Sequence, residues 1–203
     1  MDIDCSVSDK TEQIDLILGE KRTMKAEHVF DSDYYRMTEK QFTGFRAYVN
    51  MLLHHHILYV YCLRKYQRHP NPLLRIVLYH YTRKYGLEIS PLAEIGEGIY
   101  LGHPYNITVA EGAVLGKNVN LHKGCTIGRE NRGKREGVPT IGDCVSVGIN
   151  ATVVGKVHIG NDVLIAPNAY INFDVPDHSV VVGNPGIIHH RENATERYVG
   201  WLV

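Results

Sequence analysis

Histidines are the residues of this sequence whose type and placement best suit chemistry, because an imidazole can accept a proton near neutral pH or bind a metal ion. A series of aliphatic residues, each six positions after the last, runs through the second half of the chain. The series contains one step of eight residues, from Leu101 to Val109, and His103 in YLGHPYN lies within it. Where the inward aliphatic is displaced, a side chain is free to face a groove. His103 is therefore the first candidate site residue.

Two other motifs suggest chemistry that their contexts do not support. The consecutive histidines at 54–56 look like a metal site, but adjacent residues of a helix point in different directions and cannot chelate one ion together. The segment GRENRGK resembles a phosphate-binding loop, but Arg135 follows Lys134 where serine or threonine is needed, and no helix pattern follows. We therefore expect no metal site and no phosphate-binding loop at these positions.

The sixfold series predicts the main architecture. A flat strand buries every second residue and an α-helix every third or fourth, so neither explains a period of six. Short straight segments that turn at small or polar corners do explain it, with the aliphatic residues stacked inward. The sequence therefore predicts a parallel β-helix over 87–188, interrupted by a polar loop at 129–140. The series consists of Ile89, Ile95, Leu101, Val109, Leu115, Leu121, Ile127, Ile141, Val147, Val153, Ile159, Ile165 and Ile171.

A small α-helical domain is predicted before the coil, at 31–86. After a cap at Ser32 or Asp33, apolar residues at helical spacing predict one or two helices that run to about residue 69. The HPNP segment breaks them, and a further helix is expected to end at Gly86, a natural C-cap residue. Residues 1–30 form a polar, aperiodic N-terminal segment, and 189–203 form a C-terminal tail.

Composition excludes several classes of protein. The 22 Lys and Arg residues balance 22 Asp and Glu residues, so no basic field is available to gather nucleic acid. The four cysteines have no paired spacing, which favours a reduced, cytoplasmic protein. The N-terminus is acidic where a signal peptide would be basic, and the longest apolar stretch, MLLHHHILYVYCL, is too short to span a bilayer. We expect a cytoplasmic protein without a transmembrane segment.

The coil sequence also carries a family resemblance. The I-G-x-x-V-x pattern resembles the hexapeptide-repeat acyltransferases, and the segment LEISPLAEIGEGIYLGHPYNITVAEGAVLGKNVNLHKGCTIG is similar to the serine acetyltransferases. The resemblance covers about 87–190, roughly half of the chain. It implies a mainly β fold with a left-handed β-helix, although parallel crossovers are ordinarily right-handed. Spacing alone does not give the handedness.

The resemblance implies an acetyl-CoA-dependent O-acetyltransferase, in which a base takes the proton of a hydroxyl as its oxygen attacks the thioester. His103 matches the catalytic histidine, and such a base contributes about a hundred- to ten-thousandfold in rate. Glu88, in LEISP, matches the acid that orients this histidine, although the family has an aspartate there. The alternatives to these catalytic roles are that His103 is only a corner residue and that Glu88 is a solvated surface charge.

Two departures from the family pattern bear on the acceptor. The resemblance implies that the loop reaches over the site and that Arg135 contacts the acceptor, but Val138 replaces the family's second loop residue, a histidine. Gly102 replaces the aspartate that engages the amino group of serine. His122 aligns near the groove, as a substrate contact or a surface residue. Because a buried charge needs a partner, we expect a saccharide or surface-polysaccharide precursor as acceptor, with L-serine, in cysteine biosynthesis, as the alternative.

For the donor, the resemblance implies a groove between neighbouring subunits of a homotrimer, in which the pantetheine arm of acetyl-CoA lies against backbone. It leaves open a dimer of trimers through the helices. No metal is required. This chain ends in GWLV, so the sulfhydrylase partnership of some relatives, which uses a terminal isoleucine, is unsupported. Lys156 is a candidate for the nucleotide phosphates, and the other matching positions are Gly128, Ile149, Asn150, Ala166, Pro167 and Gly183.

Two functions from other classes remain as alternatives. A metalloenzyme such as the gamma carbonic anhydrases uses the same coil, but its zinc needs three converging histidines. Here His103 and His122 alone fall in that part of the coil. A non-catalytic scaffold is the other alternative, and it would not need a histidine at the irregular step.

Overall fold

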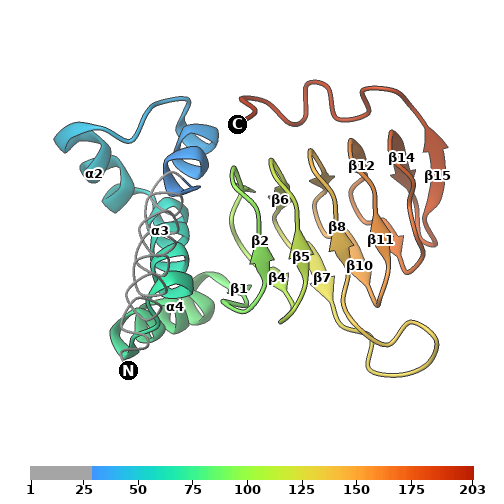
Figure 1. Cartoon of the computed structure of the whole chain (residues 1–203), viewed down its shortest axis with the longest axis horizontal. Coiled ribbons are helices and arrows are strands. Elements are labelled where there is room, and N and C mark those ends of the chain that lie inside the picture. Colours follow the sequence, from blue (N-terminus) through green and yellow to red (C-terminus); the bar gives the residue numbers. More distant parts are fainter. Residues whose placement is uncertain (1–28) are drawn as a thin grey trace, which may run out of the picture.

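The computed structural model describes residues 29–203, which form a group of helices followed by a solenoid of short strands (Figure 1). The polar N-terminal segment predicted for 1–30 lies outside the described residues except for its last two. The helices cover one end of the solenoid, next to its first strands. In the described part of the chain, no helix is long and apolar enough to cross a membrane.

The helical region has the expected break at HPNP, but it contains three helical segments before that break where one or two were predicted. Residues 29–38 are helical, and α2 (Gly44–Leu53), α3 (His55–Arg68) and α4 (Pro72–Tyr85) follow. The HPNP segment separates α3 from α4, and the Asn71 side chain caps α4 by accepting a hydrogen bond from the Leu74 N–H at 2.9 Å. Gly86 ends α4 in the left-handed conformation, with φ of 67°, as a C-cap glycine does.

The predicted cap at Ser32 or Asp33 is wrong, because both residues lie inside the helical segment 29–38. Asp33 is fully buried and accepts hydrogen bonds from Arg64 Nε at 2.8 Å and from the Ile99 N–H at 2.9 Å. Arg64, in α3, also donates to the carbonyls of Ile95 and Gly96, at 2.7 and 2.6 Å. This buried ion pair therefore joins two helices to the first coil.

The solenoid is a parallel β-helix, as predicted, with three sheets along its length. The first sheet has the order β1-β4-β7-β10-β13, the second β11-β8-β5-β2 and the third β15-β14-β12-β9-β6-β3. Successive coils pair in parallel, and among the strands of residues 29–203 only β15 pairs antiparallel, with β14. The strands are β1 (Leu87–Ile89), β2 (Glu94–Ile95), β3 (Tyr100–Gly102), β4 (Ile107–Val109), β5 (Val114–Leu115), β6 (Asn120–His122), β7 (Thr126–Gly128), β8 (Thr140–Ile141), β9 (Ser146–Val147), β10 (Thr152–Val154), β11 (His158–Ile159), β12 (Val163–Ile165), β13 (Tyr170–Ile171), β14 (Ser179–Val182) and β15 (Ile187–His190).

The aliphatic series forms the inner column. Leu101, Leu121 and Val147 lie directly above one another in the strand register and are almost completely buried. Corners between the sheets need small residues: a Cβ on Gly116 would lie 2.7 Å from the carbonyl of Gly142 in the next coil. The period of six therefore follows from one inward aliphatic and one tight corner for each side of the coil.

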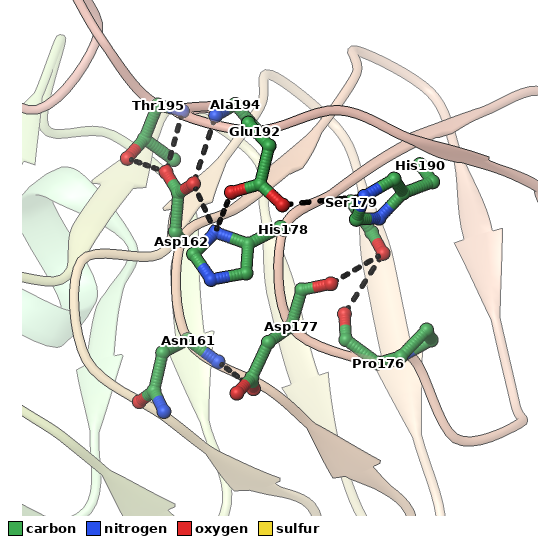
Figure 2. A network of polar contacts seen from close by, with 10 residues as sticks. All are labelled: Asn161, Asp162, Pro176, Asp177, His178, Ser179, His190, Glu192, Ala194 and Thr195. Carbon is green, nitrogen blue, oxygen red and sulfur yellow. Dashed lines mark hydrogen bonds and ion pairs between the residues drawn. The ribbon is translucent and has the colours of Figure 1, made fainter.

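After β15 the chain turns back and runs along the solenoid towards the helices (Figure 1). Asp162 fastens this tail: its carboxylate accepts hydrogen bonds from the N–H groups of Ala194 and Thr195, both at 2.9 Å, and from Thr195 Oγ1 at 2.7 Å (Figure 2). His178 Nδ1 lies 2.8 Å from the same carboxylate. We call Asp162, His178, Ala194 and Thr195 the tail clasp.

The far end of the tail is fastened to the helices and the first coils. Arg36 is buried and donates to the carbonyls of Gly98 and Gly200, at 2.7 and 3.0 Å. The Asn118 side chain both accepts from the N–H of Val203 and donates to its carbonyl, at 3.0 Å each. The tail therefore bridges the last coil and the first.

Candidate active site

His103 lies where the third sheet passes into the first, between β3 and β4. Its backbone is in the left-handed region, with φ of 49°, and its side chain is exposed. The extra residues of the eight-residue step bulge towards the helices, so that the Tyr105 ring lies 5.7 Å from Tyr85 and 5.5 Å from His55. The irregular step thus packs on α3 and α4 and leaves the imidazole facing outward, as the sequence predicted.

Corners of successive coils stack above His103. The Lys123 N–H donates to the Gly102 carbonyl at 2.9 Å, and the Asn150 N–H donates to the Lys123 carbonyl at 3.0 Å. The Asn168 N–H continues the ladder to the Ile149 carbonyl at 2.9 Å. We call this line, residues 102–105, 122–124, 148–150, 166–168 and 183, the His103 edge. Five residues predicted to bind acetyl-CoA lie along it: Ile149, Asn150, Ala166, Pro167 and Gly183.

Three other predicted site residues, Gly128, Arg135 and Lys156, lie on the opposite edge of the first sheet. Gly128 ends β7, just before the loop, and the Lys156 N–H donates to the Arg135 carbonyl at 2.9 Å. We call this line, with loop residues 129–139, the loop edge. Arg135 lines a cavity of about 390 Å³ there, together with Glu130, Arg132, Lys134, Val154 and Asn172. Because the strands of the first sheet begin at the His103 edge and end at the loop edge, a single chain does not bring Arg135 next to His103.

Glu88 lies in the middle of β1 with its side chain exposed, and it pairs in register with Thr108 of β4. It lines a groove of about 690 Å³ between α3, α4 and the first sheet, which Arg75 and Tyr59 also line. No hydrogen bond or ion pair joins Glu88 to His103, both of which belong to the described residues. The orienting role of Glu88 therefore remains a prediction.

His122 stands on the coil above Gly102, to which it pairs in register. Its Nδ1 lies 3.0 Å from the Val147 carbonyl, and the ring is half-buried. Burial lowers the pKa of this imidazole, and the charge of His103 lowers it further, while the bond to Val147 acts in the opposite direction. The neutral form is thereby favoured, with Nδ1 as the donor and Nε2 as an acceptor.

The sequence did not predict that the side chain of another coil would fill the space above Gly102. A Cβ on Gly102 would lie 2.5 Å from Cδ2 and 2.9 Å from Nε2 of His122, so the imidazole occupies the place of a side chain at 102. The two residues come together because that coil is lengthened by the eight-residue step. Counting the strand pairing through the eight-residue step would have placed His122 opposite Gly102.

The three consecutive histidines take part in packing. His54 Nδ1 lies 2.8 Å from the Asn50 carbonyl, and the His55 ring stacks on Tyr85 at 4.2 Å. Burial lowers the pKa of His56 to about 4, and the neighbouring histidines add to this effect. Across residues 29–203, no three His, Cys, Asp or Glu side chains converge as metal ligands would.

Comparisons with known proteins agree with the repeat and the resemblance. Residues 139–172 match the family model described as bacterial transferase hexapeptide (six repeats). Serine acetyltransferase 2 of Arabidopsis thaliana is 38% identical over 50% of this chain and 31% of its own length. The serine acetyltransferase of Helicobacter pylori is 36% identical over 49% of this chain and 58% of its own. A soybean serine acetyltransferase complexed with serine superimposes with a TM-score of 0.69 and 26% identity, over 86% of this chain and 74% of that one.

These findings correct one expectation and confirm two. The preference for a saccharide acceptor is wrong, because the similar proteins are serine acetyltransferases. The saccharide was preferred because Gly102 provides no carboxylate. However, the His122 imidazole occupies the space of a side chain at 102, which that preference left out of account. The matches span 31% and 58% of the two curated relatives. The predicted left-handed β-helix is confirmed by the solved structures. The predicted resemblance is confirmed as well: the chain contains hexapeptide repeats and is similar to the serine acetyltransferases.

Proposed function

We propose that this protein is an acyltransferase that moves the acetyl group of acetyl-CoA to the hydroxyl of L-serine. The observation that carries the proposal is the exposed imidazole of His103 on a coil similar to those of serine acetyltransferases. A non-catalytic scaffold would have no need of a histidine turned outward at the one eight-residue step.

His103 acts as the base in this proposal. Its imidazole accepts the proton of the serine hydroxyl while the oxygen attacks the thioester carbonyl, which forms a tetrahedral intermediate. The carbon–sulfur bond then breaks, and the imidazolium returns the proton to the departing sulfur. The products are O-acetylserine and free coenzyme A. Glu88 steadies the positive imidazole from β1, whose partner strand β4 directly follows the His103 turn.

The proposed site lies between two copies of the chain. The His103 edge supplies the base and the backbone contacts for the pantetheine arm. The loop edge supplies Arg135, which binds the serine carboxylate. It also supplies Gly128 and Lys156 for acetyl-CoA, with Lys156 at the nucleotide phosphates. Because these edges lie on opposite sides of the first sheet, a neighbouring copy must present its loop edge to His103. A closed homotrimer, with three equivalent heterologous contacts, satisfies this requirement.

The test is a screen of thiol release from acetyl-CoA with L-serine, homoserine, simple sugars and nucleotide sugars as acceptors. We expect turnover with L-serine, with an acetyl ester as product. His103→Gln should abolish it, whereas His158→Gln, which changes an exposed histidine on the second sheet, should not. Turnover restricted to a sugar, or equal activity of His103→Gln, contradicts the proposal.

A further inference from the structure

We propose that His122 recognises the amino group of the acceptor, with its Nε2 accepting a hydrogen bond from the ammonium, and that Gly102 is required to make room for this ring. The inference rests on the proposed function, since it concerns the same site. It assigns the recognition of the amino group to a neutral imidazole on the coil above His103.

The geometry fixes which nitrogen faces the substrate. Nδ1 lies 3.0 Å from the Val147 carbonyl, which can only accept, so Nδ1 carries the proton and Nε2 carries the lone pair. No residue in 29–203 hydrogen-bonds to Nε2, and this nitrogen is not among the described side-chain atoms that are buried without a partner. An acceptor of fixed direction therefore stands open on the His103 edge.

Gly102 and His122 form a matched pair. Any side chain at 102 would begin 2.5 Å from Cδ2 of the ring, inside van der Waals contact. The Tyr100 ring lies 3.2 Å from the same point, so a side chain at 102 would meet two rings. Gly102 directly precedes His103 in the chain. The ring therefore lies beside the backbone that carries the base, where the amino group of a bound amino acid falls within reach.

Electrostatics favour the same role. Burial lowers the pKa of His122 and so favours the neutral ring; the bond to the Val147 carbonyl opposes this effect and His103 adds to it. The Tyr100 ring also lies beside the imidazole, with 6.3 Å between the ring centroids. A neutral imidazole accepts from an ammonium group, whereas an imidazolium repels it. Recognition of L-serine should therefore weaken as pH falls and His122 gains a proton.

His122→Asn provides the sharpest test. The asparagine amide can still donate to the Val147 carbonyl from the position of Nδ1, but it has no acceptor at the position of Nε2. We expect the KM for L-serine to rise about ten- to hundredfold, as for a lost hydrogen bond to a charged group, with the KM for acetyl-CoA and the unfolding temperature little changed. His158→Asn is the matched control. A KM for L-serine equal to that of the wild type overturns the inference.

A second set of variants, at positions 102 and 122, tests the inference even if His122→Asn folds poorly. Gly102→Asp alone should lose activity because its carboxylate meets the ring. Gly102→Asp combined with His122→Ala places a carboxylate in the vacated space, and should lower the KM for L-serine relative to His122→Ala alone. The wild-type KM for L-serine should rise at acidic pH, and this rise should be absent in His122→Asn. A pH-independent wild-type KM overturns the inference. Failure of the wild type to acetylate L-serine instead overturns the proposed function.

Discussion

Among single residues, Asp33 decides how the helices meet the coil. Its carboxylate is fully buried and accepts from Arg64, in α3, and from the backbone of Ile99, in the coil. A buried charge that loses its partner is strongly destabilising, because the remaining charge is left without solvent. The junction between the two regions therefore contains a buried ion pair that cannot lose one partner without a large cost.

Asp33→Ala is expected to destabilise the protein by about 3–5 kcal/mol, since it leaves the Arg64 guanidinium uncompensated. Chemical denaturation followed by circular dichroism measures the change. Glu97→Gln removes an ion pair with Lys117, whose side chain is exposed, and should have a much smaller effect. Equal stabilities for the two variants would contradict the role given to Asp33.

The residue contacts that the sequence did not predict are those between residues far apart in the chain. Asp33 has the local signature of a helix cap, and nothing near it in the chain reveals Arg64 or Ile99. His103 was predictable because its signal is local, namely one irregular step in a regular series. The pairing of Gly102 with His122 required the register of two coils, and its omission led to the wrong acceptor.

At the scale of elements, the tail clasp is a pH-sensitive fastening. The hydrogen bond to Asp162 raises the pKa of His178 above its usual 6.5, and the charges of Glu192, Asp162 and Asp177 add to it. Partial burial alone would raise the pKa of Asp162. The hydrogen bonds from Thr195, His178 and Ala194 outweigh this effect and lower it below 3.8. The clasp is therefore strongest when Asp162 is ionised and His178 protonated.

The pH dependence follows from these directions. The contribution of His178 is fully present below about pH 6.5 and is lost as pH rises through its raised pKa. The contribution of Asp162 is present above about pH 3.8 and is lost as pH falls through its lowered pKa. Amide exchange protection of Ala194 and Thr195 should thus fall from pH 6 to pH 9. His178→Gln should remove this dependence while His158→Gln keeps it, and an unchanged dependence in His178→Gln would contradict the clasp.

The elements themselves were largely predictable. The period of six predicted the coil, and the HPNP segment predicted the break before α4. The polar run predicted the loop at 129–140. Each of these signals comes from neighbouring residues. The handedness could not be read from spacing, because inward residues recur identically in either hand. The path of the tail was also unpredictable, because its fastenings to Arg36, Asn118 and Asp162 join residues far apart in the chain.

At the scale of the whole molecule, the two edges of the first sheet divide the proposed site. The His103 edge and the loop edge lie on opposite sides of this sheet in one chain, so the proposed mechanism requires a neighbouring copy. A variant that lacks the function of one edge can then be complemented by a variant that lacks the other.

Co-expression of His103→Ala with Arg135→Ala tests this division. Each variant alone should be nearly inactive. In every mixed trimer, one site in about three combines an intact His103 with an intact Arg135 from the next copy, because a closed ring of three has a single junction of that order. Thiol release with L-serine should therefore return in the purified mixed species. Activity that stays at the level of the single variants would mean that both residues serve the same chain's site.

The central claim is that the outward imidazole of His103 is the base of an acetyl transfer. Its most direct test is the turnover number for thiol release from acetyl-CoA with saturating L-serine, measured for the wild type, His103→Ala and the control His158→Ala. We predict a fall of about a hundred- to ten-thousandfold for His103→Ala, with an unchanged unfolding temperature, and no fall for His158→Ala. Equal turnover numbers for wild type and His103→Ala would contradict the account.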